Sequence, residues 1–298
     1  MACHKLSDAE RAERRKADRD RLTHAVAALL SSEGWERWVK VRARNGLTRY
    51  SLRNQLLIAH QLPQASYVAG FRAFLELNRC VRKGEHAIRI FAPMSVRRAD
   101  HDTSPAPERD DADDDERRTV FRAVAVFDVS QTDPLPGKEP AALQAPCEPI
   151  DGESHGYLLD PLRDFARELG YHAILRTTGG EGEGWCDYEQ REIVVNCELP
   201  PNAQVRVLVH EIAHALGIGY RDYGRRRAEV LVDTVTYIVC GAVGLDTSGE
   251  SVPYVAGWGG KDELGAIQRY AETIDTIARR IEDNLNSAVA AGQVPTAA

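Results

Sequence analysis

The apolar residues of this 298-residue chain follow two periods, and each change of period marks a change of element. Helical spacing predicts helices at 22–30, 35–41 and 51–58, the last with Ser51 as N-cap and an end before Pro63. The pattern then predicts a strand at 65–70, a helix at 71–78 and strands at 86–92 and 120–129. The stretch 99–118 is crowded with Asp and Glu, so we expect a disordered acidic loop inside one domain.

The second half of the chain shows a similar alternation. It predicts a helix at 158–169, a strand at 171–176, a Gly-rich turn at 179–184, a strand at 192–196, and helices at 205–216, 228–245 and 262–288. We therefore expect an α+β protein with two domains. The expected divisions are a charged arm at 1–21, either a frayed helix or flexible, a first domain at 22–137, a linker at 138–155 and a second domain at 156–298.

The charge is distributed unevenly around a net value of −7. Residues 1–99 carry 20 basic and 9 acidic side chains, whereas the remainder carries 18 and 36. This asymmetry indicates that only the first half meets a polyanion such as nucleic acid. The six Cys form no Cys-x-x-Cys pair and are expected to be reduced thiols. Without a long apolar run or a signal-peptide pattern, the sequence predicts a soluble cytoplasmic protein with no membrane partner.

A His-Glu-x-x-His motif lies inside the predicted helix at 205–216. His210 and His214, four residues apart, would share one helix face and could direct both imidazoles at a single Zn²⁺ ion. Glu211 is then placed to act as general base on a metal-bound water. The alternative is a pair of ordinary helix histidines, but the intervening Glu favours the metal.

A third ligand is expected from the next helix, which offers Glu229 and, four residues later, Asp233. We assign Glu229 as the ligand and Asp233 as the acceptor that orients a ligand imidazole. The Glu-x-x-x-Asp helix resembles that of gluzincin metallopeptidases. The alternative is a solvated helix face, although the mostly apolar surroundings mean that two acids there require a partner.

A second resemblance covers the first half of the chain. It is carried by Tyr50-Ser51 with Asn54, by Gln61-Leu62-Pro63, by Val81-Arg82-Lys83-Gly84-Glu85 and by Val126-Phe127-Asp128-Val129-Ser130-Gln131-Thr132. These motifs, in this order, resemble the single-stranded-DNA-binding domain of the ArdC antirestriction family, in which a zinc-metallopeptidase-like domain follows. The resemblance implies DNA binding by residues 22–137. The second half resembles the minimal zincins of the ImmA/IrrE type.

Single-strand binding requires cations that follow the phosphates and flat groups on which bases stack. We select six residues for this role: Arg53, Arg72, Arg82, Lys83, Tyr50 and Tyr67. The alternative for each is a core aromatic or a solvated charge. The acidic loop is a further candidate, as an intramolecular competitor for the basic surface.

The chemistry expected of the second half is hydrolysis of a peptide bond in a protein substrate that the sequence does not identify. A zincin can also bind an extended peptide at a sheet edge, and the strand holding Ile193 and Val195 is the expected edge. An oxyanion donor is expected from a set of four tyrosines: Tyr220, Tyr223, Tyr237 and Tyr254. Two other readings remain, a non-proteolytic protein that coats single strands and, less favoured, a metal-dependent nuclease.

Overall fold

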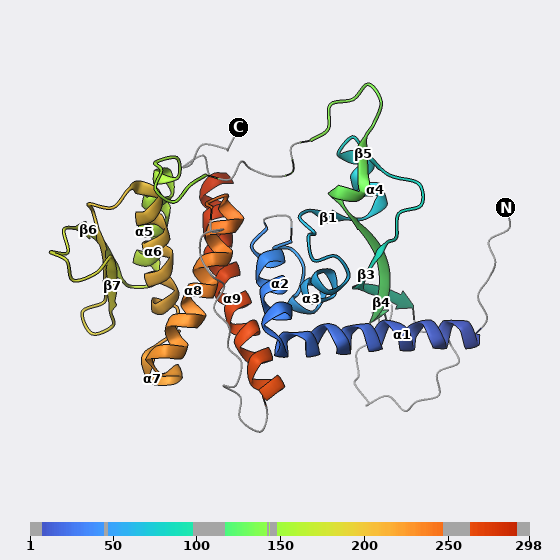
Figure 1. The fold of residues 1–298 in the computed structure, drawn as a ribbon, viewed down its shortest axis with the longest axis horizontal. Coiled ribbons are helices and arrows are strands. Elements are labelled where there is room, and N and C mark those ends of the chain that lie inside the picture. Colours follow the sequence, from blue (N-terminus) through green and yellow to red (C-terminus); the bar gives the residue numbers. More distant parts are fainter. Residues whose placement is uncertain are drawn as a thin grey trace, which may run out of the picture.

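The computed structural model describes residues 8–44, 47–97, 117–141, 143, 148–246 and 263–290 (Figure 1). Its α-helices are α1 (Asp8–Ala27), α2 (Ser32–Arg42), α3 (Leu52–Gln61), α4 (Phe71–Glu76), α5 (Leu159–Glu168), α6 (Pro201–Ala215), α7 (Tyr220–Tyr223), α8 (Arg225–Val243) and α9 (Glu263–Ala290). Its strands are β1 (Val68–Ala69), β2 (Arg79–Val81), β3 (Ile88–Arg97), β4 (Arg117–Asp128), β5 (Thr132–Pro134), β6 (His172–Arg176), β7 (Gly184–Asp187) and β8 (Glu192–Asn196). The α+β class is confirmed.

The long β3–β4 hairpin organises the first half. The two strands pair antiparallel from Ile88↔Val126 to Arg97↔Arg117, and β1 adds to the other edge of β4. Helix α3 covers the free edge of β3 with side-chain amides, because Asn54 and Gln61 each bond both backbone groups of one β3 residue, Phe91 and Arg89 respectively. The acidic stretch between the strands lies outside the described residues, except that Arg117 and Arg118 begin β4.

The charged arm expected at 1–21 is helical where the structure describes it, because α1 begins at Asp8. Residues 1–7 lie outside the described part. The helix is held because Asp18, only 7% exposed, accepts a hydrogen bond from Arg21 and pairs with Arg89 of β3. Ala25, two residues before the end of the helix, is buried in the core cluster. Sequence reasoning missed these partners because β3 lies some seventy residues further along the chain.

The small sheet of the second half corrects the expected substrate edge. Its strand order is β6-β8-β7, with β6 and β8 parallel and β7 and β8 antiparallel. The strand β8 that holds Ile193 and Val195 is therefore central, and both side chains are fully buried. The expectation was wrong because β7 was not predicted: the Gly-rich run before it indicates a turn, and β7 has only four residues.

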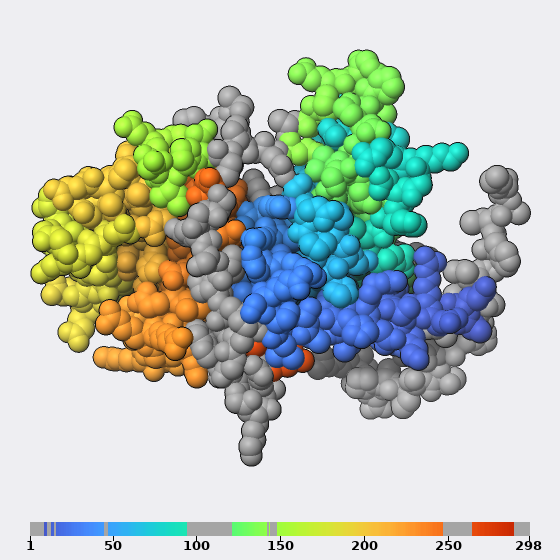
Figure 2. All heavy atoms as spheres, viewed as in Figure 1, coloured from blue at the N-terminus to red at the C-terminus, as the bar shows by residue number. Residues whose placement is uncertain are grey.

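Buried polar contacts join the two halves of the molecule. Arg42 of α2 is fully buried and pairs with both Asp275 and Glu282 of α9, at 2.6 and 2.7 Å. The end of the expected linker also packs on the second half, since the His155 amide donates to Asn202 of α6 at 2.7 Å. Figure 2 shows the two halves at opposite ends of the molecule. The division into two domains stays a prediction.

Among the helices that the structure describes, none is long and apolar enough to cross a membrane.

Candidate metal centre

Helices α6 and α8 carry the three expected metal ligands on facing surfaces. Helix α6 starts with Pro201 at its first turn, where a missing N–H costs nothing. Its apolar residues, among them Val205, Leu208 and Ile212, are buried and fix the helix in the core. Helix α8 packs against α6 and ends at Gly244, whose positive φ of 87° suits a glycine. The ligand side chains therefore project from two rigid elements.

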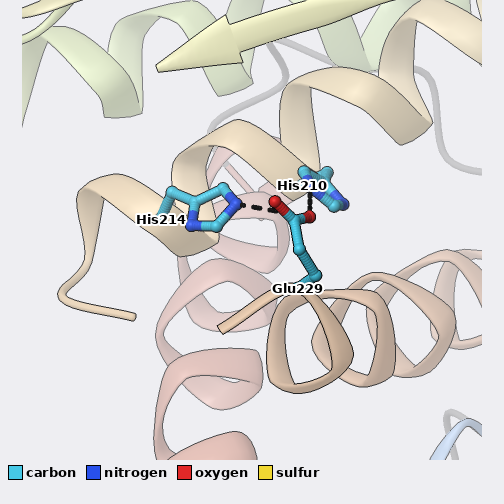
Figure 3. A group of neighbouring side chains, drawn as sticks. All are labelled: His210, His214 and Glu229. Atoms are coloured by element: carbon cyan, nitrogen blue, oxygen red, sulfur yellow. Dashed lines mark ion pairs between the residues drawn. The ribbon is translucent and has the colours of Figure 1, made fainter. Parts of the chain in front are cut away.

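The carboxylate of Glu229 lies between the two imidazoles (Figure 3). Its Oε2 is 3.5 Å from His210 Nε2 and 3.9 Å from His214 Nε2. The three donor atoms all lie within 4.8 Å of one another. Ligand atoms about 2.1 Å from a tetrahedral ion are separated by roughly 3.4 Å, so this donor set fits a zinc-sized cation. Two imidazoles and one carboxylate also suit the ligand preference of zinc.

Each imidazole is oriented through its other nitrogen. His210 Nδ1 lies 3.3 Å from Asp233 Oδ1, and His214 Nδ1 lies 2.8 Å from the Ile218 carbonyl oxygen. An Nδ1–H that donates to an oxygen leaves Nε2 with its lone pair toward the shared point. Asp233 thus lies within reach of His210, and its role as the orienting acceptor stays a prediction, whereas the Ile218 carbonyl has no sequence signal.

Burial and mutual charge shift the pKa values at this centre. Burial disfavours the charged form of His210, but hydrogen bonds to Asp233 and Glu229 outweigh it and raise the pKa to about 9. The hydrogen bond from His210 lowers the pKa of Glu229 to about 2 despite some desolvation. Burial lowers the pKa of His214. The cluster is therefore rich in negative charge and acceptors, which is the electrostatic setting of a cation site.

Glu211 lies next to the ligands and is 6% exposed. Burial raises its pKa to about 7, opposed by the nearby His210 and assisted by Glu229. Strand β7 passes close to it at Gly184, where a Cβ would stand 2.5 Å from Val207 Cγ1, 2.6 Å from the Val194 carbonyl oxygen and 3.6 Å from Glu211 Oε1. Only glycine permits this approach, so Gly184 is a site residue that sequence reasoning missed.

Tyr220 is the one expected oxyanion tyrosine that the structure shows at the centre. Its hydroxyl donates to Glu229 Oε1 at 2.5 Å, and its ring packs edge-on against His214. Tyr223 instead packs against Tyr270, Tyr237 is buried in the core, and Tyr254 lies outside the described residues.

A missed tyrosine lies on the other side of His214. The Tyr188 hydroxyl is 3.5 Å from the His214 carbonyl oxygen, and burial raises the pKa of this phenol above its ordinary value. Tyr188, Tyr220 and His214 line a cavity of about 690 Å³ that opens beside the centre, and Trp185 and Cys186 of β7 form another wall. The cavity thus meets the centre at His214 and is large enough for a peptide side chain.

The six residues expected to bind DNA are spread over the first half. Arg53, Arg72 and Lys83 are exposed on α3, α4 and the turn after β2. Arg82 is held by Glu85 and Asp133. The Tyr50 hydroxyl donates to the Val68 carbonyl oxygen at 2.7 Å, and the Tyr67 ring packs on Phe74. The Arg49 guanidinium lies over the rings of both Tyr50 and Tyr67, and the role of all six residues stays a prediction.

Comparison with known proteins supports the resemblance. Residues 19–127 match the family model of the N-terminal domain of anti-restriction factor ArdC. An uncharacterized protein of Bacillus anthracis is 26% identical over 275 residues, which cover 79% of this chain but only 46% of that protein. The chain therefore spans less than half the length of this curated relative.

Two solved structures align with most of the chain. The metal-free crystal structure of the antirestriction protein ArdC from the R388 plasmid aligns with 91% of this chain and 98% of its own, at a TM-score of 0.52 and 18% identity. A Mn(II)-bound crystal structure of that protein aligns with 90% and 98%, at a TM-score of 0.49 and 18% identity. Residues 19–127 of the chain are therefore an ArdC N-terminal domain, and the chain as a whole is similar in fold to an antirestriction ArdC protein.

Proposed function

We propose that this ArdC-like protein is a zinc-dependent metallopeptidase whose N-terminal region binds single-stranded DNA. His210, His214 and Glu229 would hold the ion. The observation that carries the peptidase part is the buried carboxyl group of Glu211, set beside three candidate ligands, of which His214 also lines a cavity. A purely structural metal site has no use for such a base. The DNA part rests on the match of residues 19–127 to the ArdC N-terminal domain.

The chain's own residues suggest how a peptide bond would be broken. A bound zinc ion would lower the pKa of its water and polarise the scissile carbonyl. Glu211 would take a proton from the attacking water and deliver it to the leaving amine as the C–N bond breaks. Burial and Glu229 raise the pKa of Tyr220, so its hydroxyl stays protonated and can donate to the developing oxyanion.

The substrate would lie along β7. This strand is an edge of the small sheet, and Trp185, Cys186 and Asp187 line the cavity beside His214. An extended peptide could add to that edge by backbone hydrogen bonds, with one side chain in the cavity. Gly184 permits β7 to approach Glu211, which would place the peptide backbone next to the base.

The test is Glu211→Gln, assayed by mass spectrometry on a peptide library. We expect hydrolysis to fall by about 10²–10⁴-fold, because general acid–base catalysis is lost while the ligands stay. Glu189→Gln is the matched control, since Glu189 is an exposed acid that lines the same cavity and lies outside the ligand set. Hydrolysis that is unchanged in Glu211→Gln would contradict the assignment of this residue. A wild type that binds DNA but cleaves nothing would favour a protein that only coats single strands.

A further inference from the structure

A cleft of about 680 Å³ lies at the far end of the first half, away from the metal centre. Its floor is one face of the β3–β4 hairpin and its wall is α1, which runs beside both strands in Figure 1. The lining consists of Arg14, Asp18, Arg19, Arg89, Phe91, Phe121, Arg122 and Ala123. Neither the sequence pattern nor the family match singles out this place.

The cleft carries a net positive charge, and most of its arginines are not neutralised by an acid of the described part of the protein. Its one acid, Asp18, is buried and already bound by Arg21 and Arg89. Within the described ranges, the guanidinium groups of Arg14, Arg19 and Arg122 have no ion pair, and all three residues are exposed.

Helix α1 carries acids as well as these arginines. Glu13 and Asp20 lie on the face of α1 opposite Asp18, whereas Glu10 precedes Arg14 by one turn on the same side. None of these three acids lines the cleft, whose lining holds four arginines and one acid, so a ligand in it would be a polyanion.

Two aromatic rings lie on the floor. Residues directly opposite in an antiparallel pair share a face of the sheet, and Phe91 faces Ala123 while Phe121 faces Pro93. Phe91 and Phe121 are therefore diagonal neighbours on one face. Phe121 is 70% exposed, more than any other large apolar side chain in the described part of the chain. An aromatic ring that a folded protein leaves in water beside arginines is typical of a platform for an unpaired base.

We propose that this cleft binds single-stranded nucleic acid, with Arg14, Arg19 and Arg122 on the phosphates and Phe121 stacked on a base. The assignment rests on the proposed DNA-binding function of the N-terminal region and moves its site away from Arg53, Arg72 and Lys83. Stacking on Phe121 requires a base that is free of its complement, so the cleft discriminates against duplex.

The experiment is a fluorescence-anisotropy titration of the full chain with a labelled oligo-dT strand at two salt concentrations. The cleft variant is Arg14→Gln/Arg19→Gln/Arg122→Gln, and its matched control is Arg53→Gln/Arg72→Gln/Lys83→Gln, which removes the same charge. We expect the cleft variant to bind at least about tenfold more weakly at low salt, with a log–log salt slope reduced by about two. The control variant should change affinity by less than about twofold. The reverse order, or equal losses, overturns the proposal.

A second pair of variants separates stacking from charge. Phe121→Ala should weaken binding about fivefold or more at both salt concentrations without changing the salt slope, whereas Phe71→Ala, an exposed phenylalanine of α4, should not. Both side chains are exposed, so thermal unfolding should stay within about 2 °C of wild type, and this pair decides the matter even if the triple variant fails to fold.

The remaining outcomes separate failure of the cleft assignment from failure of the proposed DNA-binding function. If the wild type binds the strand and both cleft variants bind like it, the cleft is wrong and the DNA function stands. If the wild type binds no single strand, both are wrong. Equal losses for Phe121→Ala on single strand and on duplex would refute base stacking. Single-stranded RNA of the same sequence serves as the arm that tells DNA from RNA.

Discussion

Two buried clusters in this molecule each combine positive and negative side chains, but they differ in composition and in expected role. Around Arg42, one fully buried guanidinium is met by Asp275 and Glu282, and Asp275 also pairs with Arg279 and accepts a hydrogen bond from Gln55. Around His210, two imidazoles meet Glu229 and Asp233, and Glu211 lies alongside. The first cluster contains its own permanent cations, Arg42 and Arg279. The second has acceptors in excess, has only titratable cations and borders a cavity at His214.

This difference teaches how to tell a structural cluster from a binding one. Arginine stays charged at all ordinary pH values, so the Arg42 cluster is complete as it stands. In the His210 cluster, only protonated histidines could neutralise the negative charge of the three carboxyl groups. A bound metal ion would neutralise that charge more fully. The same comparison predicts that damage to the first cluster changes stability, whereas damage to the second changes metal affinity.

The largest expected effect on stability is that of Arg42→Met. Removing one partner of a buried ion pair leaves uncompensated carboxylates, and we expect the free energy of unfolding to fall by about 3–5 kcal/mol in urea titrations. Arg37→Met on the same helix is the control. Its exposed pair with Glu33 should contribute less than about 1 kcal/mol. A loss for Arg42→Met no larger than that of the control would show that the cluster does not hold the two halves together.

A smaller effect is expected from Asp233→Ala, which removes the acceptor of His210 Nδ1. Outer partners of this kind contribute about 10–100-fold in metal affinity, so zinc should still bind in one equivalent but more weakly by that factor. Asp222→Ala removes an acid from the adjacent cavity without touching an imidazole and should change the affinity by less than about threefold. Competition with a chromophoric chelator measures both. If the two variants weaken zinc binding equally, the loss comes from removing a negative charge near the site. Orientation of the His210 imidazole would then not contribute to zinc affinity.

The sequence was sufficient to predict the candidate site residues that lie at helical spacing within a single element. The i, i+4 spacing places His210 and His214 on one face of α6, and the apolar pattern of α8 places Glu229 and Asp233 on the next helix. Ser51 precedes α3 as expected, although its side chain makes no cap hydrogen bond.

The sequence was insufficient to predict contacts between residues or strands that are far apart along the chain. Ile193 and Val195 read equally well as central or edge strand, and only the pairing with both β6 and β7 decides between them. Gly184 shows in the sequence as a turn glycine, and its role against Glu211 appears only when β7 lies on α6. The cleft residue Phe121 reads as an ordinary apolar strand position, because period-2 alternation does not tell which face the rest of the protein covers.

The most direct test of the metal centre is calorimetric titration of Zn²⁺ into chelator-treated wild type, Glu211→Gln and Glu229→Ala. We predict one equivalent in the wild type and in Glu211→Gln, and binding weakened at least about 100-fold in Glu229→Ala, because a ligand is lost in that variant alone. Zinc binding that survives unchanged in Glu229→Ala, or a wild type that binds no zinc, would contradict a centre built from His210, His214 and Glu229.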